Sequence, residues 1–384
     1  MAQPAPGVEY GPIRTPLDQA AVERYLSQHI PAFHLASSIN SHSVNRDNPT
    51  YLLTSTKGTQ YVLRKKPPGK LVSQTAHAIE REYRIIEALG KEGSVPVPKV
   101  YALCLDASVL GTPFYVMEYL KGRIFTDVRM PELKSKEERR ACWLSIIQTL
   151  ASLHSLSAKE IGLGDFGSTA PFYPRQIKSL TKVSRAQAAV KDLETGKPVG
   201  EIPGIDFLLE WYAKETPNGG KREGSVIHGD FKCDNMIFHP TEPRVIGVLD
   251  WELSTLGHPY SDLSNLLQPF YIPKQGEGGV SQASHLTALR DIPPSLLPIP
   301  DAQTLLQEYC KLVGEPYPLP RWTACVSFAF FRLAVITQGI AARSAQGQAS
   351  SAKAKTYATI FPQIGELAVD TIRRAGEEGG RGRL

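Results

Sequence analysis

Several features that mark other classes of protein are missing from this chain of 384 residues. The five cysteines are widely spaced and form no Cys-x-x-Cys pair, which argues for a reducing compartment and against a disulfide or zinc framework. The first residues lack the basic-then-apolar pattern of a signal peptide. There is no apolar run of about 18 residues, so we expect no membrane span.

The excess of one sign of charge over the other is also small, with 43 lysines and arginines against 38 aspartates and glutamates. The net charge is only +5, with no concentrated stripe of lysine and arginine, so we expect no nucleic-acid partner. The expected localisation is cytoplasmic. Residues 382–384, Gly-Arg-Leu, are distantly similar to the Ser-Lys-Leu peroxisomal address but differ at its first position, which leaves the peroxisome as the alternative. Residues 376–384 are expected to form a disordered tail.

What is present is a well-defined centre. A hydrophobic fraction of 42% supports a packed core. In residues 226–238 two short apolar runs flank a polar loop, and a further apolar run at 245–249 ends at Asp250. Within the loop, His228 and Asp230 are followed by Asn235, five positions after Asp230. This matches the His-x-Asp-x-x-x-x-Asn spacing of a kinase catalytic loop. The pattern predicts strands with polar side chains at their ends.

These residue types suit phosphoryl transfer to a hydroxyl group. A carboxylate must orient the acceptor hydroxyl and take its proton, which is the predicted role of Asp230. Mg²⁺ prefers oxygen ligands from carboxylates and amides, which assigns Asn235 and Asp250 to the metal. Lys232 is placed to stabilise charge on the phosphoryl group during transfer. His228 is expected to order the loop rather than to transfer protons.

On these residues the sequence resembles the aminoglycoside phosphotransferase and choline kinase-like superfamily. It is most similar to the kinase-like domain of the branch that is fused to acyl-CoA dehydrogenases, which it also resembles at residues 61–69, 81–84 and 331–343. The resemblance implies an α+β, bilobal protein-kinase-like fold. A small N-lobe with an antiparallel β-sheet and one helix (1–121) would bind ATP. A larger, mainly helical C-lobe (122–384) would carry the catalytic loop, the metal and the acceptor site.

The expected N-lobe supplies the nucleotide site. Residues 50–56 and 60–66 predict a hairpin, and residues 74–90 predict a helix capped by Gly90. In the superfamily a strand lysine holds the α- and β-phosphates, and the resemblance puts Arg64 in its place. Lys65 is the alternative, although alternation points it to the opposite face. Glu82 lies on the inward face of the helix and needs a cationic partner, which we expect to be Arg64.

Two further sets of residues carry weaker expectations. The strand at 114–120 resembles a kinase hinge, in which Met117 packs beside adenine and the backbone from Glu118 to Leu120 pairs with it. An ordinary strand leaving the lobe is the alternative. Three arginines are candidate ligands for an anionic group of the acceptor, or members of structural ion pairs. They are Arg175, together with Arg332 and Arg343, which are expected to be buried on the strongly apolar helix at 322–343.

The leading hypothesis is therefore an ATP- and Mg²⁺-dependent kinase for the hydroxyl group of a small molecule. Fusion of related domains to acyl-CoA dehydrogenases implies a hydroxyacyl-CoA or a hydroxy acid as acceptor. A pseudokinase or scaffold protein with impaired nucleotide binding is the alternative, supported by a phosphate loop (37–48) that has no glycine. A metal-dependent phosphohydrolase is a third reading, which would need neither Arg64 nor Glu82.

Overall fold

The computed structural model describes residues 17–31, 33–35, 40–41, 49–67, 78–220, 222–274, 286–348 and 359–381. The chain forms two compact units. Unit 1 comprises Met1–Phe166 and His228–Thr255, and unit 2 comprises Gly167–Ile227 and Leu256–Leu384. The catalytic loop thus belongs to the same unit as the N-terminal sheet, whereas a boundary after residue 121 would separate them. The two-lobe division at that residue stays a prediction.

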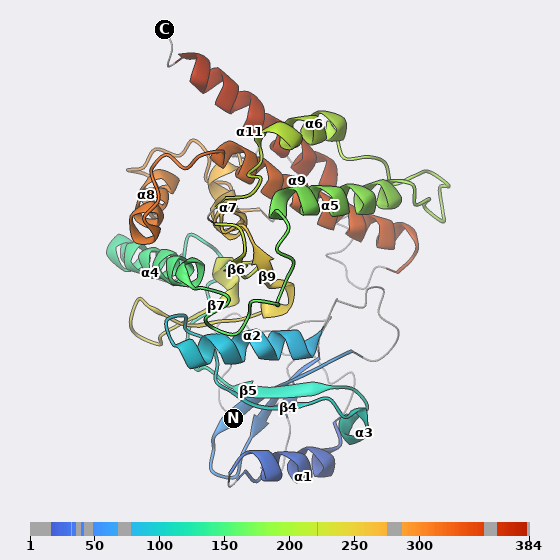
Figure 1. Cartoon of the computed structure of the whole chain (residues 1–384), viewed down its shortest axis with the longest axis vertical. Helices are drawn as coiled ribbons and strands as arrows, with labels where there is room; N and C mark the ends of the chain where they lie inside the picture. Colours follow the sequence, from blue (N-terminus) through green and yellow to red (C-terminus); the bar gives the residue numbers. More distant parts are fainter. Residues whose placement is uncertain are drawn as a thin grey trace. The chain divides into compact units, whose positions relative to one another are not determined.

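Unit 1 is built on a five-stranded sheet with the strand order β1-β2-β3-β5-β4. Its adjacent strands pair antiparallel, so that β3 is the central strand and β4 is an edge strand next to β5, as Figure 1 shows for β4 and β5. The predicted hairpin is present as β2 and β3, in register from Thr50↔Arg64 to Thr54↔Gln60. The strands are β1 (Asn40–Ser41), β2 (Thr50–Thr54), β3 (Gln60–Lys65), β4 (Val100–Cys104) and β5 (Phe114–Glu118).

Alternation along the strands separates an apolar face from a polar one. Leu63 pairs with Val116, and both are fully buried in the cluster that includes Leu26 of α1 (Gln19–His29). The next pair in register, Arg64 and Tyr115, points to the opposite face. That face meets α2 (Ile79–Glu92), which runs along the sheet in Figure 1. A short helix, α3 (Ala107–Leu110), joins β4 to β5.

The helix α2 ends later than its sequence predicts. Its apolar residues Ile79, Ile86 and Leu89 are buried as expected, but Gly90 lies inside the helix. The cap is Gly93, whose φ of +89° lies in the left-handed region that glycine adopts without strain. The expected cap at Gly90 was wrong. A second glycine, Gly93, follows within one helical turn, and it is this glycine that ends the helix.

The remaining elements of unit 1 carry the polar loop. The long helix α4 (Lys136–Ser155) starts at Ser135, whose hydroxyl accepts a hydrogen bond from the Glu138 N–H at 3.0 Å. The strands β7 (Met236–Phe238) and β8 (Val245–Val248) form an antiparallel hairpin. Two short 3₁₀ turns, η1 (Cys233–Asn235) and η2 (Trp251–Leu253), flank this hairpin and bear the predicted metal-binding residues at their edges.

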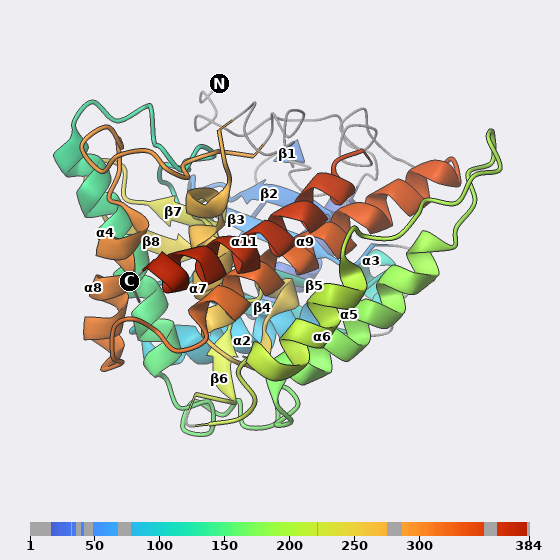
Figure 2. The same ribbon diagram turned by 90° about the horizontal axis from the view of Figure 1, so that it is seen from above.

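Unit 2 is mainly helical. In Figure 2, α11 lies alongside α9, with α5 and α6 beside them. A buried chain of hydroxyls joins three of these helices: the Tyr212 and Ser327 hydroxyls are 2.8 Å apart, and Ser327 donates to Ala368 O at 2.7 Å. The elements are α5 (Phe172–Ala188), α6 (Ile205–Glu215), β6 (Ser225–Ile227), β9 (Thr255–Gly257), α7 (Tyr260–Leu267), η3 (Gln268–Tyr271), α8 (Ala302–Val313), α9 (Trp322–Ala345) and α11 (Phe361–Arg381).

The C-terminal tail differs from its expectation. Residues 376–381, predicted to be disordered, continue α11 as far as Arg381. The apolar face of this helix, with Ile364, Leu367 and Ala368 fully or almost fully buried, gives it a packed stem from which the glycine-rich end extends. The glycine-rich composition of residues 376–384 predicted disorder. That composition does not show that the preceding part of the helix is packed against the core. Residues 382–384 lie outside the described part of the chain.

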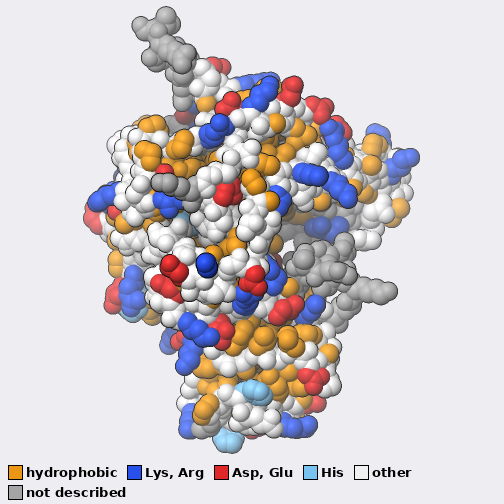
Figure 3. Space-filling view, in the orientation of Figure 1, with side chains coloured by type: hydrophobic (Ala, Val, Ile, Leu, Met, Phe, Trp, Pro, Cys, Tyr) orange, Lys and Arg blue, Asp and Glu red, His pale blue; other side chains and the backbone are white. Residues whose placement is uncertain are grey.

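Helix α9 is long and apolar enough to cross a membrane by length and composition alone. However, 78% of its most apolar window is buried inside the protein, as in the core helix of a globular unit. All five cysteines are buried as free thiols. On the face shown in Figure 3, the basic and acidic side chains of the described residues are interspersed.

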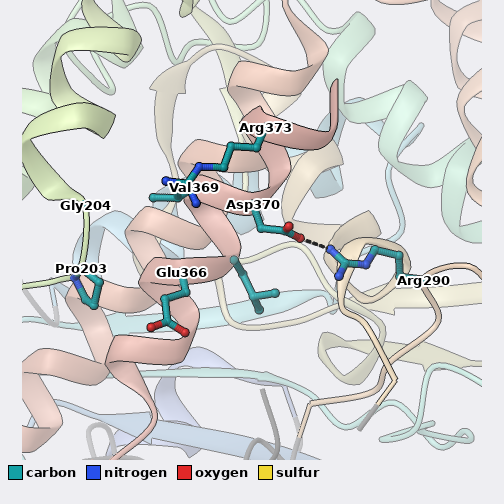
Figure 4. Close-up of a pocket in the computed structure, with 8 residues that line it drawn as sticks. Pro203, Gly204, Arg290, Glu366, Val369, Asp370 and Arg373 are labelled. Atoms are coloured by element: carbon teal, nitrogen blue, oxygen red, sulfur yellow. Dashed lines mark hydrogen bonds and ion pairs between the residues drawn. The ribbon is translucent and has the colours of Figure 1, made fainter. Parts of the chain in front are cut away.

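Unit 2 also contains a pocket of about 380 Å³ along α11. Figure 4 shows that Arg290 reaches Asp370 across one side of it, while Arg373 and Glu366 lie along the helix. The Arg290–Asp370 ion pair neutralises the most enclosed charges of this pocket. The pocket belongs to unit 2, whereas the catalytic motif belongs to unit 1.

Candidate active site

The catalytic loop is shaped by one histidine and one glycine. The Nδ1 of His228 accepts a hydrogen bond from the Asp230 N–H at 3.2 Å, so its Nε2 carries the proton and donates to Leu249 O at 2.8 Å. Gly229 has a φ of +86°, and a Cβ there would lie 2.4 Å from Leu253 O. Only glycine fits this position, and the histidine ties the loop to the strand that leads to Asp250.

The side chain of Asp230 is held through one of its oxygens. Its Oδ2 lies 3.2 Å from the Lys232 ammonium and 3.3 Å from the Asn235 amide nitrogen. The same Asn235 nitrogen donates to the Asp230 carbonyl at 2.9 Å. Lys232 also contacts Asp234 at 3.5 Å. Lys232 and Asn235 thus both engage Oδ2, the same oxygen of the Asp230 carboxylate.

A buried arginine links the sheet to the second carboxylate of the motif. Arg64 donates through Nη1 to Glu82 at 2.6 Å and through Nη2 to Asp250 at 2.8 Å. The expected Glu82–Arg64 pair is therefore formed, and the guanidinium fork bridges two carboxylates that are far apart in the sequence. Asp250 adopts a left-handed conformation (φ +67°) that starts the η2 turn. Arg64 Nε is buried without a hydrogen-bond partner among the described residues.

The electrostatics of this cluster favour an ionised Arg64. Burial lowers the pKa of Arg64, but the negative charges of Glu82 and Asp250 raise it by more, so the net direction is upward. Burial raises the pKa of Glu82 to about 7, although Arg64 opposes that shift. For Lys232, burial lowers the pKa, but the negative charges of Asp230 and Asp234 raise it by more. The net pKa of Lys232 is therefore above its ordinary value.

Two residues of the cluster were missed by the sequence-based reasoning. Glu252 lies 3.6 Å from Arg64 Nη2, which makes it the third carboxylate around this cation. Tyr115 is fully buried opposite Arg64 in the sheet, its hydroxyl has no hydrogen-bond partner among the described residues, and burial together with the nearby charge of Glu82 raises its pKa. The signal for Glu252 was its position two residues after Asp250. The signal for Tyr115 was its place on a strand whose neighbour carries Arg64.

The residues fit a divalent cation whose remaining ligands come from elsewhere. Because the Asn235 nitrogen faces two acceptors, its Oδ1 is left as an oxygen donor. Asn235 and Asp250 are brought together by the hydrogen bond from the Leu249 N–H to Asn235 O at 2.8 Å. Among the described residues no group of three His, Cys, Asp or Glu forms a closed metal site. Two protein oxygens suit Mg²⁺, which keeps waters and phosphate oxygens in its shell.

The predicted hinge is only partly available. The Glu118 N–H donates to Lys99 O at 2.7 Å, so it cannot pair with adenine, which corrects that part of the expectation. Contacts to adenine would fall to the Glu118 carbonyl and to Leu120. Met117 is buried on the α2 side of the sheet, two residues from Tyr115. The glycine-free loop 37–48 lies almost entirely outside the described residues.

The three candidate acceptor arginines belong to unit 2. Arg175 donates to Leu256 O at 3.1 Å and packs over the Phe172 ring, contacts that stabilise the polypeptide around β9. Arg332 is half-buried on α9, and Arg343 is exposed near the end of that helix. The expectation that both arginines of α9 are buried is thus wrong for Arg343. Their roles toward an acceptor stay predictions.

The fold and the site together define a protein-kinase-like phosphotransferase. They combine an antiparallel sheet with a cation–carboxylate pair, a His-x-Asp-x-x-x-x-Asn loop and a strand-borne aspartate. The model of the phosphotransferase enzyme family matches residues 38–292, and the chain belongs to this family.

Two curated relatives support the branch that is fused to acyl-CoA dehydrogenases. The chain is 39% identical over 362 residues to acyl-CoA dehydrogenase family member 11 of Rattus norvegicus, a match that covers 93% of this chain. The human protein of the same name is 38% identical over 366 residues. The chain spans 43% of the length of each of these relatives.

Solved structures agree with the fold. A candidate aminoglycoside phosphotransferase from Ralstonia eutropha JMP134 is 35% identical, with a TM-score of 0.78, and the match covers 94% of this chain and 99% of that one. The aminoglycoside phosphotransferase APH(4)-Ia, solved as a ternary complex with AMP-PNP and hygromycin B, superimposes with a TM-score of 0.52 at 15% identity. This second match covers 90% of this chain and 99% of that one and concerns the fold alone.

Proposed function

We propose that this chain transfers the γ-phosphoryl group of ATP to a hydroxyl group of a small molecule, with Asp230 as the base. The observation that supports this most is the fixed Asp230 carboxylate: Lys232 and Asn235 hold Oδ2, and Oδ1 would take the proton of the acceptor hydroxyl. In the reaction the acceptor O–H bond breaks and its proton passes to Asp230. The acceptor oxygen then bonds to phosphorus as the bond to the β,γ-bridging oxygen breaks and ADP leaves.

The other residues provide positive charge and position. Arg64, held by Glu82 and Asp250, would supply positive charge near the phosphates. Lys232 neutralises charge on the phosphoryl group as it is transferred. Asn235 and Asp250 would hold Mg²⁺, which neutralises the phosphates when bound. Adenine would lie against Met117 and pair with the Glu118 carbonyl and with Leu120.

The acceptor class is proposed from the named relatives. Their name, acyl-CoA dehydrogenase family member 11, points to acyl-CoA chemistry, which favours a hydroxyacyl-CoA or a hydroxy acid as acceptor. The APH(4)-Ia complex contains hygromycin B, but a polycationic acceptor calls for an acidic pocket, and the net charge of +5 here suits an anionic acceptor better. The reaction is proposed to take place in the cytoplasm.

The experiment that tests the proposal follows labelled γ-phosphate from Mg-ATP into a fractionated metabolite extract. Wild type is compared with Asp230→Asn, which keeps the shape of the side chain but cannot take a proton. A labelled small molecule that appears only with wild type supports the kinase and identifies the acceptor. If wild type labels no small molecule and Mg-ATP does not raise its melting temperature, the proposal is wrong and a pseudokinase takes its place. Label released only as inorganic phosphate, also by Arg64→Ala, would indicate a phosphohydrolase.

A further inference from the structure

The segment Arg81-Glu82-Tyr83-Arg84 of α2 has contacts on two sides of the helix. Glu82 is buried against Arg64, and the Tyr83 ring meets the Tyr115 ring edge to face at 6.2 Å. The two arginines, three positions apart, lie together on another side. Only the Glu82 side has been given a role in the proposed reaction, so the arginines call for an explanation of their own.

Both arginines bind the turn at residues 162–166, which follows α4. Arg81 donates through Nη2 to Phe166 O at 2.6 Å, and its guanidinium carbon lies 4.2 Å from the centroid of the Phe166 ring. Arg84 donates to Gly162 O at 2.8 Å and forms an ion pair with Asp165. A guanidinium that stacks on an aromatic ring while donating to a carbonyl has a narrowly defined position, which a flexible ammonium would not have.

The turn that receives these arginines is itself anchored. Leu163 and Phe166 are fully buried, the Leu163 N–H donates to Ala158 O at 2.7 Å, and the Phe166 N–H donates to Leu163 O at 2.9 Å. The start of α2, by contrast, has weak support of its own, because Ala78 at its N-cap provides no side-chain hydrogen bond. The anchored turn is thus an external support for the first two turns of the helix that carries Glu82.

We propose that Arg81 and Arg84 fasten α2 to the 162–166 turn and thereby hold Glu82 against Arg64, which makes them positioning residues for the nucleotide site. This inference rests on the proposed function, because it assigns Arg64 to the phosphates. The physical link is short: Glu82 is adjacent to Arg81 on a rigid helix. A shift of α2 that lengthens the Arg81–Phe166 hydrogen bond therefore also moves Glu82 away from its 2.6 Å contact.

The test compares Arg81→Met and Arg84→Met with a control on the same helix, Lys91→Met. Methionine keeps an apolar stem but removes the charge and the donors, and Lys91 pairs only with Glu87 on α2 itself among the described residues. Dissociation constants for Mg-ATP are measured by titration calorimetry. We expect Arg81→Met to weaken binding by about fivefold or more, in the range of a typical coupling between sites. The more exposed Arg84 contact should have a smaller effect, because water screens its ion pair with Asp165, and Lys91→Met should bind as wild type does.

A double variant separates a positioning role from a general loss of stability. If Arg81 acts through Glu82, Arg81→Met combined with Glu82→Gln binds Mg-ATP no more weakly than Glu82→Gln alone. Additive losses, or an Arg81→Met variant that binds as tightly as wild type, would overturn the inference. If Arg81→Met does not fold, Phe166→Leu, which removes the aromatic face but keeps the carbonyl, takes its place in the cycle.

Hydrogen exchange in the absence of nucleotide provides the structural readout. In Arg81→Met we expect faster exchange of the α2 amides, with β5 unchanged from wild type. Equal protection of α2 in the variant and in wild type would contradict the fastening. If wild type does not bind Mg-ATP, the proposed function fails and this inference fails with it. If wild type binds and Arg81→Met binds equally well, only the inference fails.

Discussion

Arg64 is the residue on which the proposed nucleotide site depends most. One guanidinium faces three carboxylates, at 2.6 Å (Glu82), 2.8 Å (Asp250) and 3.6 Å (Glu252). When all are ionised the cluster has an excess of negative charge, which a further cation would relieve. A lysine at this position has one compact charged group and could not bridge Glu82 and Asp250 with the same geometry.

The buried Glu82 predicts a pH dependence of stability. Its pKa rises from 4.5 to about 7 on folding, so the folded chain holds this proton more tightly than the unfolded chain does. The corresponding stabilisation is complete below the unfolded pKa and is lost as the pH rises through about 7. Urea unfolding of Glu82→Gln should therefore show a weaker decline in the free energy of unfolding between about pH 5 and pH 8 than wild type. Parallel pH curves for the two proteins would contradict the shift.

Gly229 and Gly58 form a matched pair for testing the geometry of the catalytic loop. Both have positive φ, +86° and +80°, but a Cβ at Gly58 would meet no atom within 4 Å, whereas one at Gly229 would lie 2.4 Å from Leu253 O. Gly58→Ala should cost about 1–2 kcal/mol of stability from backbone strain alone. Gly229→Ala should cost more and should displace Asp230. The check is urea unfolding of both variants, and equal costs would show that the clash is relieved.

At the scale of single residues, spacing correctly predicted that Asp230 and Asn235 lie together, with Asp250 nearby, because loop and strand are close in the sequence. The catalytic and metal-binding roles of these residues stay predictions, and spacing did not reveal everything around them. Alternation correctly preferred Arg64 over Lys65 for Glu82. Glu252 was missed because its contact with Arg64 joins segments almost two hundred positions apart, and because the left-handed Asp250 turns the chain in a way that no periodicity predicts.

Among the elements, α2 has the strongest influence on the site, and its two glycines test how it ends. Gly90 is inside the helix, where a Cβ would make an ordinary 3.7 Å contact with Val97. Gly90→Ala should therefore stabilise the chain by up to about 1 kcal/mol. Gly93→Ala should destabilise it by roughly 1 kcal/mol or more, because alanine pays a steric cost at a φ of +89°. Melting temperatures that shift in opposite directions would confirm the cap, and two shifts of the same sign would contradict it.

The elements themselves followed from the sequence better than their ends did. The hairpin of β2 and β3, the strand β5 and the strands around the catalytic loop all lie where the sequence pattern put them. The errors fall at helix ends, at Gly90 and in the tail at 376–381. A helix end depends on which neighbour covers the last turn, and that neighbour is remote in the sequence.

For the whole molecule, the division into two units predicts where a nucleotide acts. All residues proposed to bind Mg-ATP belong to unit 1. Saturating Mg-ATP should therefore slow hydrogen exchange in segments such as β3, α2 and residues 228–255, while α9 and α11 of unit 2 change little. Hydrogen exchange is measured by mass spectrometry. A control with ADP in EDTA, in which no free metal is present, separates the effect of the metal. Protection centred on α11 would place the nucleotide elsewhere.

The five buried thiols have a practical consequence for work on this chain. Burial raises the pKa of Cys142 and Cys310 to about 11 and that of Cys233 and Cys325 also upward, so few of these sulfurs are reactive thiolates near neutral pH. We therefore expect the native cysteines to react little with maleimides. A single cysteine introduced on the exposed surface can then carry a fluorophore without removing any of the natural ones.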